Sequence, residues 1–238
     1  MDNAIYATLS RQTGLMSQMS VVAQNIANAS TTGFRAERVI FAEVLRGTGD
    51  GPSLSMGAAR ARQIVQSQGA IEMTGGPFDL AIEGEGFFVV EGEGGPRLTR
   101  AGRFLPNEAG DLVTPDGARV LDAGGAPLFV PQGAGPVAVG ADGTVSAGGL
   151  PMGQVGVVVP RDPLGLRREA GARFDAPGGW DPAPAPRVLQ GALEGSNVDP
   201  VAEVARMIEV QRAYEMGQSF LEREDDRVRK TIQSITVR

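Results

Sequence analysis

The sequence contains no cysteine, no histidine and a single lysine, Lys230. Disulfides, thiol nucleophiles, Cys/His zinc sites and histidine general bases are therefore excluded, and any catalysis would depend on carboxylates, hydroxyls, this lysine or tyrosine. Acidic residues number 28 against 22 basic ones, so the net charge is −6. A chain with that balance has no basic surface of the kind that binds nucleic acid.

Aromatic residues and long apolar runs are also scarce. Phe, Trp and Tyr make up 5% of the chain, whereas it holds 34 glycines and 16 prolines. This composition is typical of turn-rich β structure rather than of a helix bundle. No run of 18 apolar residues occurs, and Asp2 stands where a secretory leader would carry positive charge. We therefore expect neither a membrane span nor a Sec-type leader.

The N-terminal residues predict a helix over residues 3–29. Its apolar residues are spaced alternately four and three apart, with polar Gln12 in one of the slots. The seam consists of Ile5, Leu9, Met16, Met19, Ala23 and Ile26. Between residues 1 and 34 the only charges are Asp2 and Arg11, fewer than a solvated helix of that length carries. We therefore expect this helix to be enclosed by other chains.

A second helix is predicted near the other end, over residues 200–235. Asn197 or Asp199 can cap it, and Pro200 suits its first turn. Near-heptad positions follow at Met207, Val210, Tyr214, Gly217, Leu221, Val228 and Ile235. Acids and bases alternate along EREDDRVRK, so one face meets water or a polar partner. An intramolecular hairpin of the two ends would explain both seams, and assembly with other chains would add contacts to it.

Between the two helices lies a region of short strands and turns. Apolar runs such as LAI and FFVV alternate with turns rich in Gly, Pro and Asn, which predicts a β domain of successive hairpins. In the segment before it, FAEVLRG fits either a short helix or a strand. The expected organisation is an assembly helix at 1–34, a connecting segment at 35–69, a β domain at 70–190 and a second assembly helix at 191–238.

Candidate catalytic and ligand sites are weak. Glu83 and Glu85 flank Gly84 and could act as an acid/base pair, but the surrounding glycines favour a solvated turn. GEGFFV lacks the third glycine of a dinucleotide-binding loop, and residues 111–117 lack the acid spacing of a calcium loop. The Phe87–Phe88 pair favours core packing over ligand binding. We expect no catalytic residue, no metal site and no cofactor.

Four stretches of the sequence form motifs that follow one another in a set order. They are QNIANASTTGFRAER, FDLAIEGEGFFVV, TRAGRFLPNEAGDLVTPDGARVL and LEGSNVDPVAEVARMIEVQRAYEMGQS. Each is similar to a motif of the axial proteins of the bacterial flagellum, the rod and hook proteins of the basal body, and the order is that family's order. Arg35 stands where lysine is usual and Val204 where methionine is frequent, and both changes keep the charge or apolar character.

The resemblance implies a structural subunit of the rod, located in the periplasmic space. Its fold would be mainly β with α-helical termini: an irregular, hairpin-rich central domain plus N- and C-terminal helices pairing as a coiled-coil-like domain. In this family subunits stack helically, with the terminal helices inside a tube and the β domain outside. The implied partners are copies of itself, other rod proteins and the flagellar type III export apparatus, which would take the place of a Sec leader. Neither nucleic acid nor membrane insertion is expected.

The same resemblance, together with the seams, gives an expected assembly interface. Its residues are Ile5, Leu9, Met16, Met19, Asn25, Ile26, Asn28, Thr32, Gly33, Phe34, Ser196, Asn197, Val198, Met207, Tyr214 and Leu221. Asn25 and Asn28 share a helix face, from which they can bond to neighbouring backbones. Phe34 is expected to anchor the turn toward the β domain. Because the first helix is polar, we expect the free chain to have largely disordered ends that order on assembly.

The position in the rod is the open question within the family. The opening MDNAIY and the length resemble the proximal rod subunits most, with distal rod subunits and hook-type proteins as alternatives. An enzymatic alternative is a carboxylate-dependent peptidoglycan hydrolase that uses Glu83 and Glu85.

Overall fold

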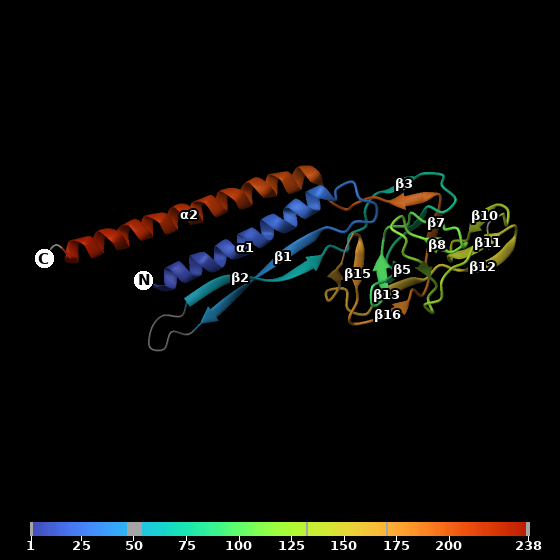
Figure 1. Cartoon of the computed structure of the whole chain (residues 1–238), viewed down its shortest axis with the longest axis horizontal. Helices are drawn as coiled ribbons and strands as arrows, with labels where there is room; N and C mark the ends of the chain where they lie inside the picture. The colour runs from blue at the N-terminus through green and yellow to red at the C-terminus, as the bar shows by residue number, and fades with distance from the viewer. Residues whose placement is uncertain (1, 47–53, 132, 170, 237–238) are drawn as a thin grey trace. The chain divides into compact units, whose positions relative to one another are not determined.

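A computed structural model describes residues 2–46, 54–131, 133–169 and 171–236 of the chain. The described residues form one helix at each end and strands between them (Figure 1). The prediction of a mainly β fold with helical termini is thus confirmed. The residues form two compact units: unit 1 holds Met1–Ala27, Glu37–Gln63 and Asp199–Arg238, and unit 2 holds Asn28–Ala36 and Ile64–Val198.

Unit 1 contains both helices, α1 (Asp2–Ala27) and α2 (Pro200–Thr236). The start of α2 follows from its sequence, because the Asp199 side chain accepts hydrogen bonds from the backbone N–H groups of Val201 and Ala202 at 2.9 and 3.1 Å. This is an N-cap, with Pro200 at the first helical position. The helices lie side by side and antiparallel (Figure 1), and Gln12 Nε2 donates to the Tyr214 carbonyl at 3.0 Å.

The segment that the sequence left open between helix and strand forms two strands. They are β1 (Glu37–Arg46) and β2 (Leu54–Ile64), which pair in a two-stranded sheet. Strand β1 also packs on α1, where a Cβ atom added to Gly14 would come within 2.8 Å of the Phe41 ring. A glycine inside the helix therefore lets the aromatic ring approach the helix backbone.

Unit 2 is built from antiparallel pairs of short strands. Its largest sheet has the order β14-β15-β6-β5-β13-β16, and β9 also pairs with β5. These strands are β5 (Phe87–Gly92), β6 (Gly95–Thr99), β9 (Val120–Leu121), β13 (Val157–Pro160), β14 (Arg167–Arg168), β15 (Arg173–Asp175) and β16 (Trp180–Pro182).

Four smaller sheets complete unit 2. A three-stranded one contains β10 (Val137–Val139), β11 (Thr144–Ala147) and β12 (Leu150–Gln154). The two-stranded ones pair β4 (Leu80–Ile82) with β17 (Val188–Gln190), β3 (Ile71–Met73) with β18 (Ala192–Glu194), and β7 (Leu105–Pro106) with β8 (Leu112–Val113). In the turn between β7 and β8, Asn107 Oδ1 accepts a hydrogen bond from the Asp111 N–H at 2.9 Å.

The core of unit 2 lies on both faces of β5. Phe88 and Val90 belong to one cluster of buried side chains, and Phe87 and Val89 to another. Successive strand residues point to opposite faces, so the uninterrupted run FFVV indicates a strand covered on both sides. Phe87 meets Phe174 and Phe88 meets Phe104 edge to face, with ring centroids 5.7 and 5.3 Å apart. The expectation that Phe87 and Phe88 are core residues is confirmed.

Candidate assembly interface

Asn25 connects three elements of unit 1. Its side chain is 1% exposed; Nδ2 donates to the Glu37 carbonyl at 2.9 Å, and Oδ1 accepts from the Glu37 N–H at 3.0 Å. Nδ2 also lies 3.3 Å from Glu203 Oε2 on α2. The amide therefore pairs with β1 as another strand's peptide group would, and holds α1 and α2 in the same contact. The backbone that Asn25 binds here is that of its own chain.

The Thr-Gly-Phe motif forms a tight turn within unit 2. Gly33 has a φ of +67°, and a Cβ atom there would come 2.2 Å from the Ala101 nitrogen, so only glycine fits. Its N–H donates to the Glu194 carbonyl at 2.7 Å. Phe34 is buried with Val198 and Ala36, and the Arg168 guanidinium lies 4.2 Å from the centre of the Phe34 ring. Phe34 therefore anchors this turn in unit 2.

The Ser-Asn-Val motif meets the same turn from the other end of the chain. Asn197 Oδ1 accepts from the Ala36 N–H at 2.6 Å, and Nδ2 donates to the carbonyls of Val65 and Ser67 at 3.1 and 2.8 Å. The Asn197 N–H donates to the Phe34 carbonyl at 3.2 Å. Asn197 thus joins its own segment to residues 34–36 and 65–67, and all three segments belong to unit 2.

A buried ionic cluster lies beside these two motifs. Arg35 Nη2 is 2.9 Å from Glu194 Oε1, and Arg100 Nη1 is 3.0 Å from Glu194 Oε2, with all three side chains at most 3% exposed. Arg35 also donates to the carbonyls of Gln66 and Ser67. Arg100 donates to the carbonyls of Ile82 and Gly84 at 3.1 and 2.5 Å. One carboxylate therefore balances two guanidinium groups, which leaves a formal charge of +1.

Burial changes the proton affinity of both arginines. It lowers the pKa of Arg100 to about 10, and the attraction of Glu194 opposes part of that shift. The pKa of Arg35 is also lowered by burial and partly restored by Glu194. Without the carboxylate, two like charges would remain in a site from which water is excluded, which is strongly unfavourable. Glu194 is therefore required for this part of unit 2 to stay folded.

Sequence reasoning did not single out Arg35, Arg100 and Glu194 as a site. Each belongs to a different motif of the resemblance, in TTGFRAER, LTRAG and LEGSNV respectively. The sequence did contain one shared feature: each of these three charged residues is followed directly by alanine or glycine. Arg168, which also lies 5.0 Å from the centre of the Phe174 ring, belongs to no quoted motif and gave no such signal.

The expected interface side chains of unit 1 fall into two groups. Leu9 and Met16 are 48% and 59% exposed, whereas Met19, Ile26, Met207, Tyr214 and Leu221 are partly buried. The Ile5 side chain lies outside the described residues. In the single chain α1 buries a different face, with Leu15, Val21 and Val22. Of the remaining expected residues, Asn28, Thr32 and Ser196 are partly buried in unit 2.

The candidate catalytic carboxylates lie in an exposed turn. Both Glu83 and Glu85 are exposed on either side of Gly84, and Glu83 pairs with Arg187 at 3.2 Å. Among the described residues no group of three or more acidic side chains is placed to hold a metal ion. Neither α1 nor α2, over the residues searched, has a stretch long and apolar enough to cross a membrane.

Comparison with known proteins places these motifs in one family. The model described as "Flagella basal body rod protein" matches residues 5–35, "Flagellar hook protein FlgE/F/G D1 domain" matches 81–147, and "Flagellar basal body rod FlgEFG protein C-terminal" matches 189–234. The first and third matches include the Thr-Gly-Phe and Ser-Asn-Val motifs, and the second includes Arg100.

Relatives that match 90% or more of the chain are also flagellar rod proteins. The chain is 43% identical over 224 residues to the flagellar basal-body rod protein FlgF of Caulobacter vibrioides, with 90% of each chain covered. It is 31% identical over 255 residues to FlgF of Escherichia coli, covering 100% of both, and 30% identical over 256 residues to FlgG of Bacillus subtilis, covering 94% of this chain and 95% of that one. The chain belongs to the family of flagellar basal-body rod proteins. Within that family it groups with the FlgF type.

Proposed function

We propose that this chain is a structural subunit of the proximal rod of the bacterial flagellum, and that its copies assemble helically through unit 1. In the assembled state the helices would complete a coiled-coil-like domain with helices of neighbouring subunits. The partners are copies of the chain and other rod proteins. The relatives named above are rod proteins, so the chain has no enzymatic role. The exposed turn that carries Glu83 and Glu85 is explained without catalysis.

The observation that carries this proposal is the outward face of α1. Over residues 8–27, whose side chains the structure describes, exposed positions recur in steps of four and three and carry no charge; the one exposed charge of this part of α1, Arg11, lies beside them. The exposed residues of this stripe are Leu9, Thr13, Met16, Ser20, Ala23 and Ala27. Water would favour charged side chains there, whereas a neighbouring helix favours small and apolar ones in this spacing. The α1 face is therefore suited to burial by another subunit.

The most direct test places a charge on that face. Met16→Glu puts a carboxylate on an exposed position, so the fold of the single chain is expected to persist while assembly of the rod, and swimming, are lost. Leu164→Glu is the matched control, because Leu164 is 67% exposed in unit 2. Electron microscopy of isolated basal bodies gives the measurement. Normal rods containing the Met16→Glu chain would contradict assembly through this face.

The proximal position is tested by removing the chain. Basal bodies from a strain without it are expected to have a rod interrupted near its proximal end. An interruption at the distal end would instead support a role of the FlgG type.

The route to the rod is part of the proposal. A subunit of the periplasmic rod has to leave the cytoplasm, and we propose the flagellum's own type III apparatus as its route. Fractionation of cells in which that apparatus is inactive should then find the chain in the cytoplasm, and its presence in the periplasm would contradict this route.

A further inference from the structure

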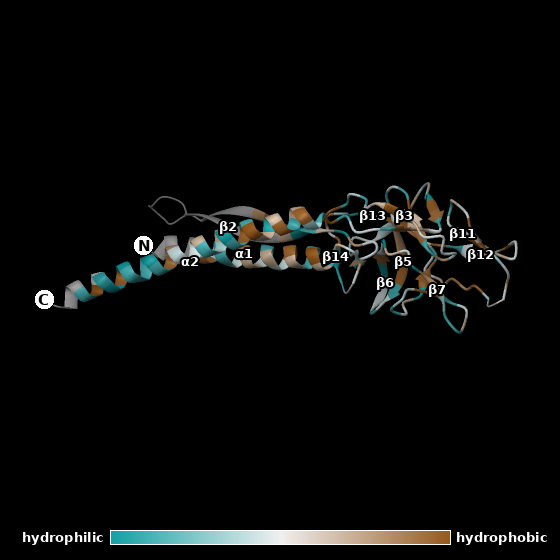
Figure 2. Cartoon of the chain, turned by 90° about the horizontal axis from the view of Figure 1, so that it is seen from above, coloured by the Kyte–Doolittle hydropathy of each residue, from teal (hydrophilic) through white to brown (hydrophobic). Residues whose placement is uncertain are grey.

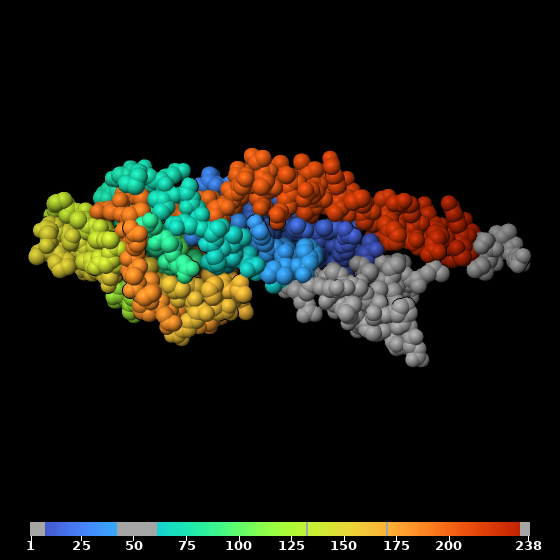
Figure 3. Space-filling model, turned by 180° about the vertical axis from the view of Figure 1, so that it is seen from behind, coloured from blue at the N-terminus to red at the C-terminus, as the bar shows by residue number. Residues whose placement is uncertain are grey.

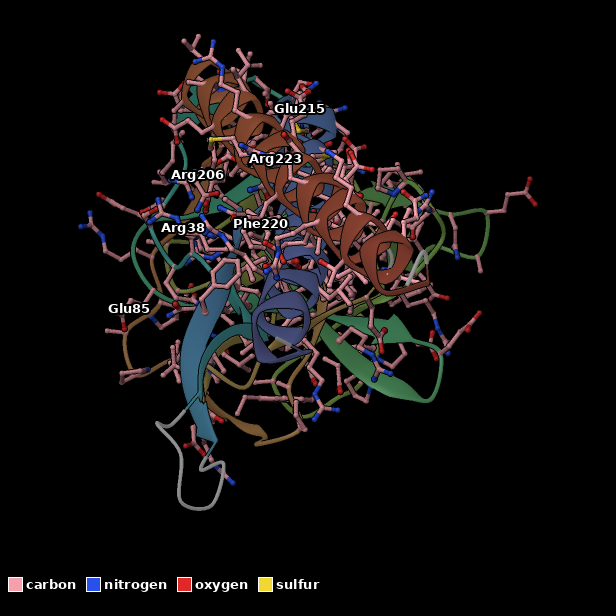
Figure 4. All side chains as sticks on the ribbon, turned by 90° about the vertical axis from the view of Figure 1, so that its left-hand side faces the viewer. Arg38, Glu85, Arg206, Glu215, Phe220 and Arg223 are labelled. Carbon is pink, nitrogen blue, oxygen red and sulfur yellow. The ribbon has the colours of Figure 1, made fainter. Side chains whose placement is uncertain are left out.

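A groove runs between the two helices of unit 1. We call it the Gln12 groove; it is lined by Thr8, Arg11, Gln12 and Leu15 of α1 and by Ala213, Met216, Gly217 and Phe220 of α2. It has a volume of about 350 Å³, and its walls are mostly apolar. Phe220 is labelled on the flank of α2 in Figure 4. Gly217 of α2 lets the Gln12 side chain approach the helix, because a Cβ atom there would lie 2.5 Å from Gln12 Nε2.

One buried polar atom of a residue that lines the groove lacks a hydrogen bond. Gln12 is 8% exposed, and its Nε2 donates a hydrogen bond to the Tyr214 carbonyl. Its Oε1 is buried and has no partner among the described residues. A buried acceptor without a donor destabilises the structure that contains it. A neighbouring chain that brings a hydrogen-bond donor together with an apolar surface would remove this destabilisation, so the groove is suited to binding such a chain.

The end of α2 supplies apolar side chains that need cover. The contacts Gln12–Tyr214 and Asn25–Glu203 set the antiparallel register of the helices. Followed to the start of α1, this register reaches α2 near residue 225, so the last turns of α2 extend past the described part of α1 (Figures 1 and 3). There Val228 and Ile232 are 38% and 57% exposed.

We propose that the Gln12 groove receives the end of α2 from a second copy of this chain. The inference depends on the proposed function, because it specifies how neighbouring subunits of the rod contact each other. Val228 and Ile232 are four apart and share a helix face, so both can enter one groove. Gln233, next to Ile232, carries an amide donor of the kind that Gln12 Oε1 lacks.

This arrangement also has the right symmetry. The end of α2 and the Gln12 groove lie at different places on unit 1, so each copy offers one surface and receives the other. In the repeating assembly proposed above, each copy receives the end of α2 from one neighbour and offers its own end to another. Such a heterologous contact continues into a ring or an open helix, whereas a reciprocal exchange would close as a dimer and give no ladder of multimers in the test below.

Cysteine cross-linking tests the proposal without background, since the chain has no cysteine of its own. One chain carrying Met216→Cys and Ile232→Cys should form a ladder of disulfide-linked multimers in isolated rods. Bonding within one chain is excluded, because 16 helical residues span roughly 24 Å, whereas a disulfide needs Cα atoms within about 7 Å. The control, Val201→Cys with Ile232→Cys, moves the first cysteine along α2 away from the groove and should give no ladder.

Two outcomes separate this inference from the proposed function. Normal rods without the Met216–Ile232 ladder would overturn the groove contact while leaving the structural role in place. If the cysteine chains form no rods, the groove is tested in a cysteine-free chain by Ala213→Leu, which fills it, against Gln218→Leu, which adds a leucine at an exposed position outside it. We expect swimming to fall at least tenfold only with Ala213→Leu. Unchanged swimming of that strain would also overturn the contact.

Discussion

The two units differ in how completely each covers its own apolar surface. Unit 2 buries both faces of its central strand, whereas unit 1 exposes apolar residues of α1 and α2. Figure 2 shows where hydrophobic residues occur along both helices. The two units also differ in net charge. Unit 1 holds 12 acidic and 12 basic residues and is neutral, whereas unit 2 holds 16 acidic and 10 basic residues and carries the whole net charge of −6. Unit 2 therefore resembles a protein that folds alone, and unit 1 resembles part of a larger assembly.

The largest expected effect is on unit 2. Glu194→Ala leaves Arg35 and Arg100 buried without a counter-charge, so it should lower the free energy of unfolding by about 3–5 kcal/mol. Denaturant titration followed by the fluorescence of Trp180, the only tryptophan, measures this unit. Glu169→Ala removes an exposed partner of Arg97 and should cost at most about 1 kcal/mol. Equal effects of the two substitutions would contradict the importance of the buried cluster.

The next largest loss of stability is expected from a substitution at a glycine with a positive φ. Gly33→Ala combines the positive φ with a clash against the backbone of Arg100 and Ala101, so part of unit 2 has to move. Gly117→Ala is the matched control: its φ is +88° but an added Cβ atom meets open space, so it should cost only the left-handed backbone penalty of about 1–2 kcal/mol. The same Trp180 titration should show a larger loss for Gly33→Ala, and a smaller one would mean that the turn relaxes freely.

Asn25→Ala should affect unit 1 alone. It removes two hydrogen bonds to the Glu37 backbone and leaves those groups buried, at a cost of about 1–3 kcal/mol in the assembled protein. Swimming is expected to fall while the Trp180 transition stays at its normal denaturant concentration. Ser20→Ala, at an exposed position of the same helix, is the control for loss of a polar group. A shift of the Trp180 transition by Asn25→Ala would contradict the separation of the two units.

Amide hydrogen exchange compares the two units directly in the free chain. Because unit 1 leaves apolar surface uncovered, we expect its helical amides to exchange at least about tenfold faster than those of β5, a difference of at least ~1.4 kcal/mol in opening free energy. Two well-protected helices in the free chain would show that unit 1 needs no neighbour to be stable.

The smallest expected effect concerns an exposed ion pair of unit 2. The hydrogen bond from Arg119 lowers the pKa of Glu91. A lowered pKa means that the pair stabilises the fold above the ordinary carboxyl pKa, and that this contribution is lost as pH falls through the lowered value. Arg119→Gln should return the pKa of Glu91 toward its ordinary value in an NMR titration. An unchanged Glu91 titration would show that the pair does not persist in solution.

The sequence predicted features that repeat locally. Both helices lie within two residues of their expected bounds, because heptad spacing and the cap at Asp199 are local signals. The core role of Phe87 and Phe88 was also predictable, since a continuous apolar run in a strand has few alternatives. The pairing of β1 with β2 was not, because FAEVLRG has the composition of either a helix or a strand, and no local pattern reports that Phe41 packs against Gly14 of α1.

The candidate sites show the same limit. Asn25 was identified from its motif, but its partner, the Glu37 backbone, depends on where β1 lies. The ionic cluster joins residues from three motifs, and no local pattern reports that these motifs meet. Leu9 and Met16 fit the predicted seam, yet the single chain turns them outward, since α1 buries Leu15, Val21 and Val22.

The position of Glu194 also affects the order in which the chain can fold. Arg100 and Glu194 are 94 residues apart in sequence, and Arg35 is farther still. Strands β3 and β4 likewise pair with β18 and β17, which come at the end of unit 2. Contacts at such separation form slowly, since a long loop has to close first. Because synthesis begins at the N-terminus, unit 2 cannot be completed until about four-fifths of the chain has been made, and strands β3 and β4 are made before the strands with which they pair.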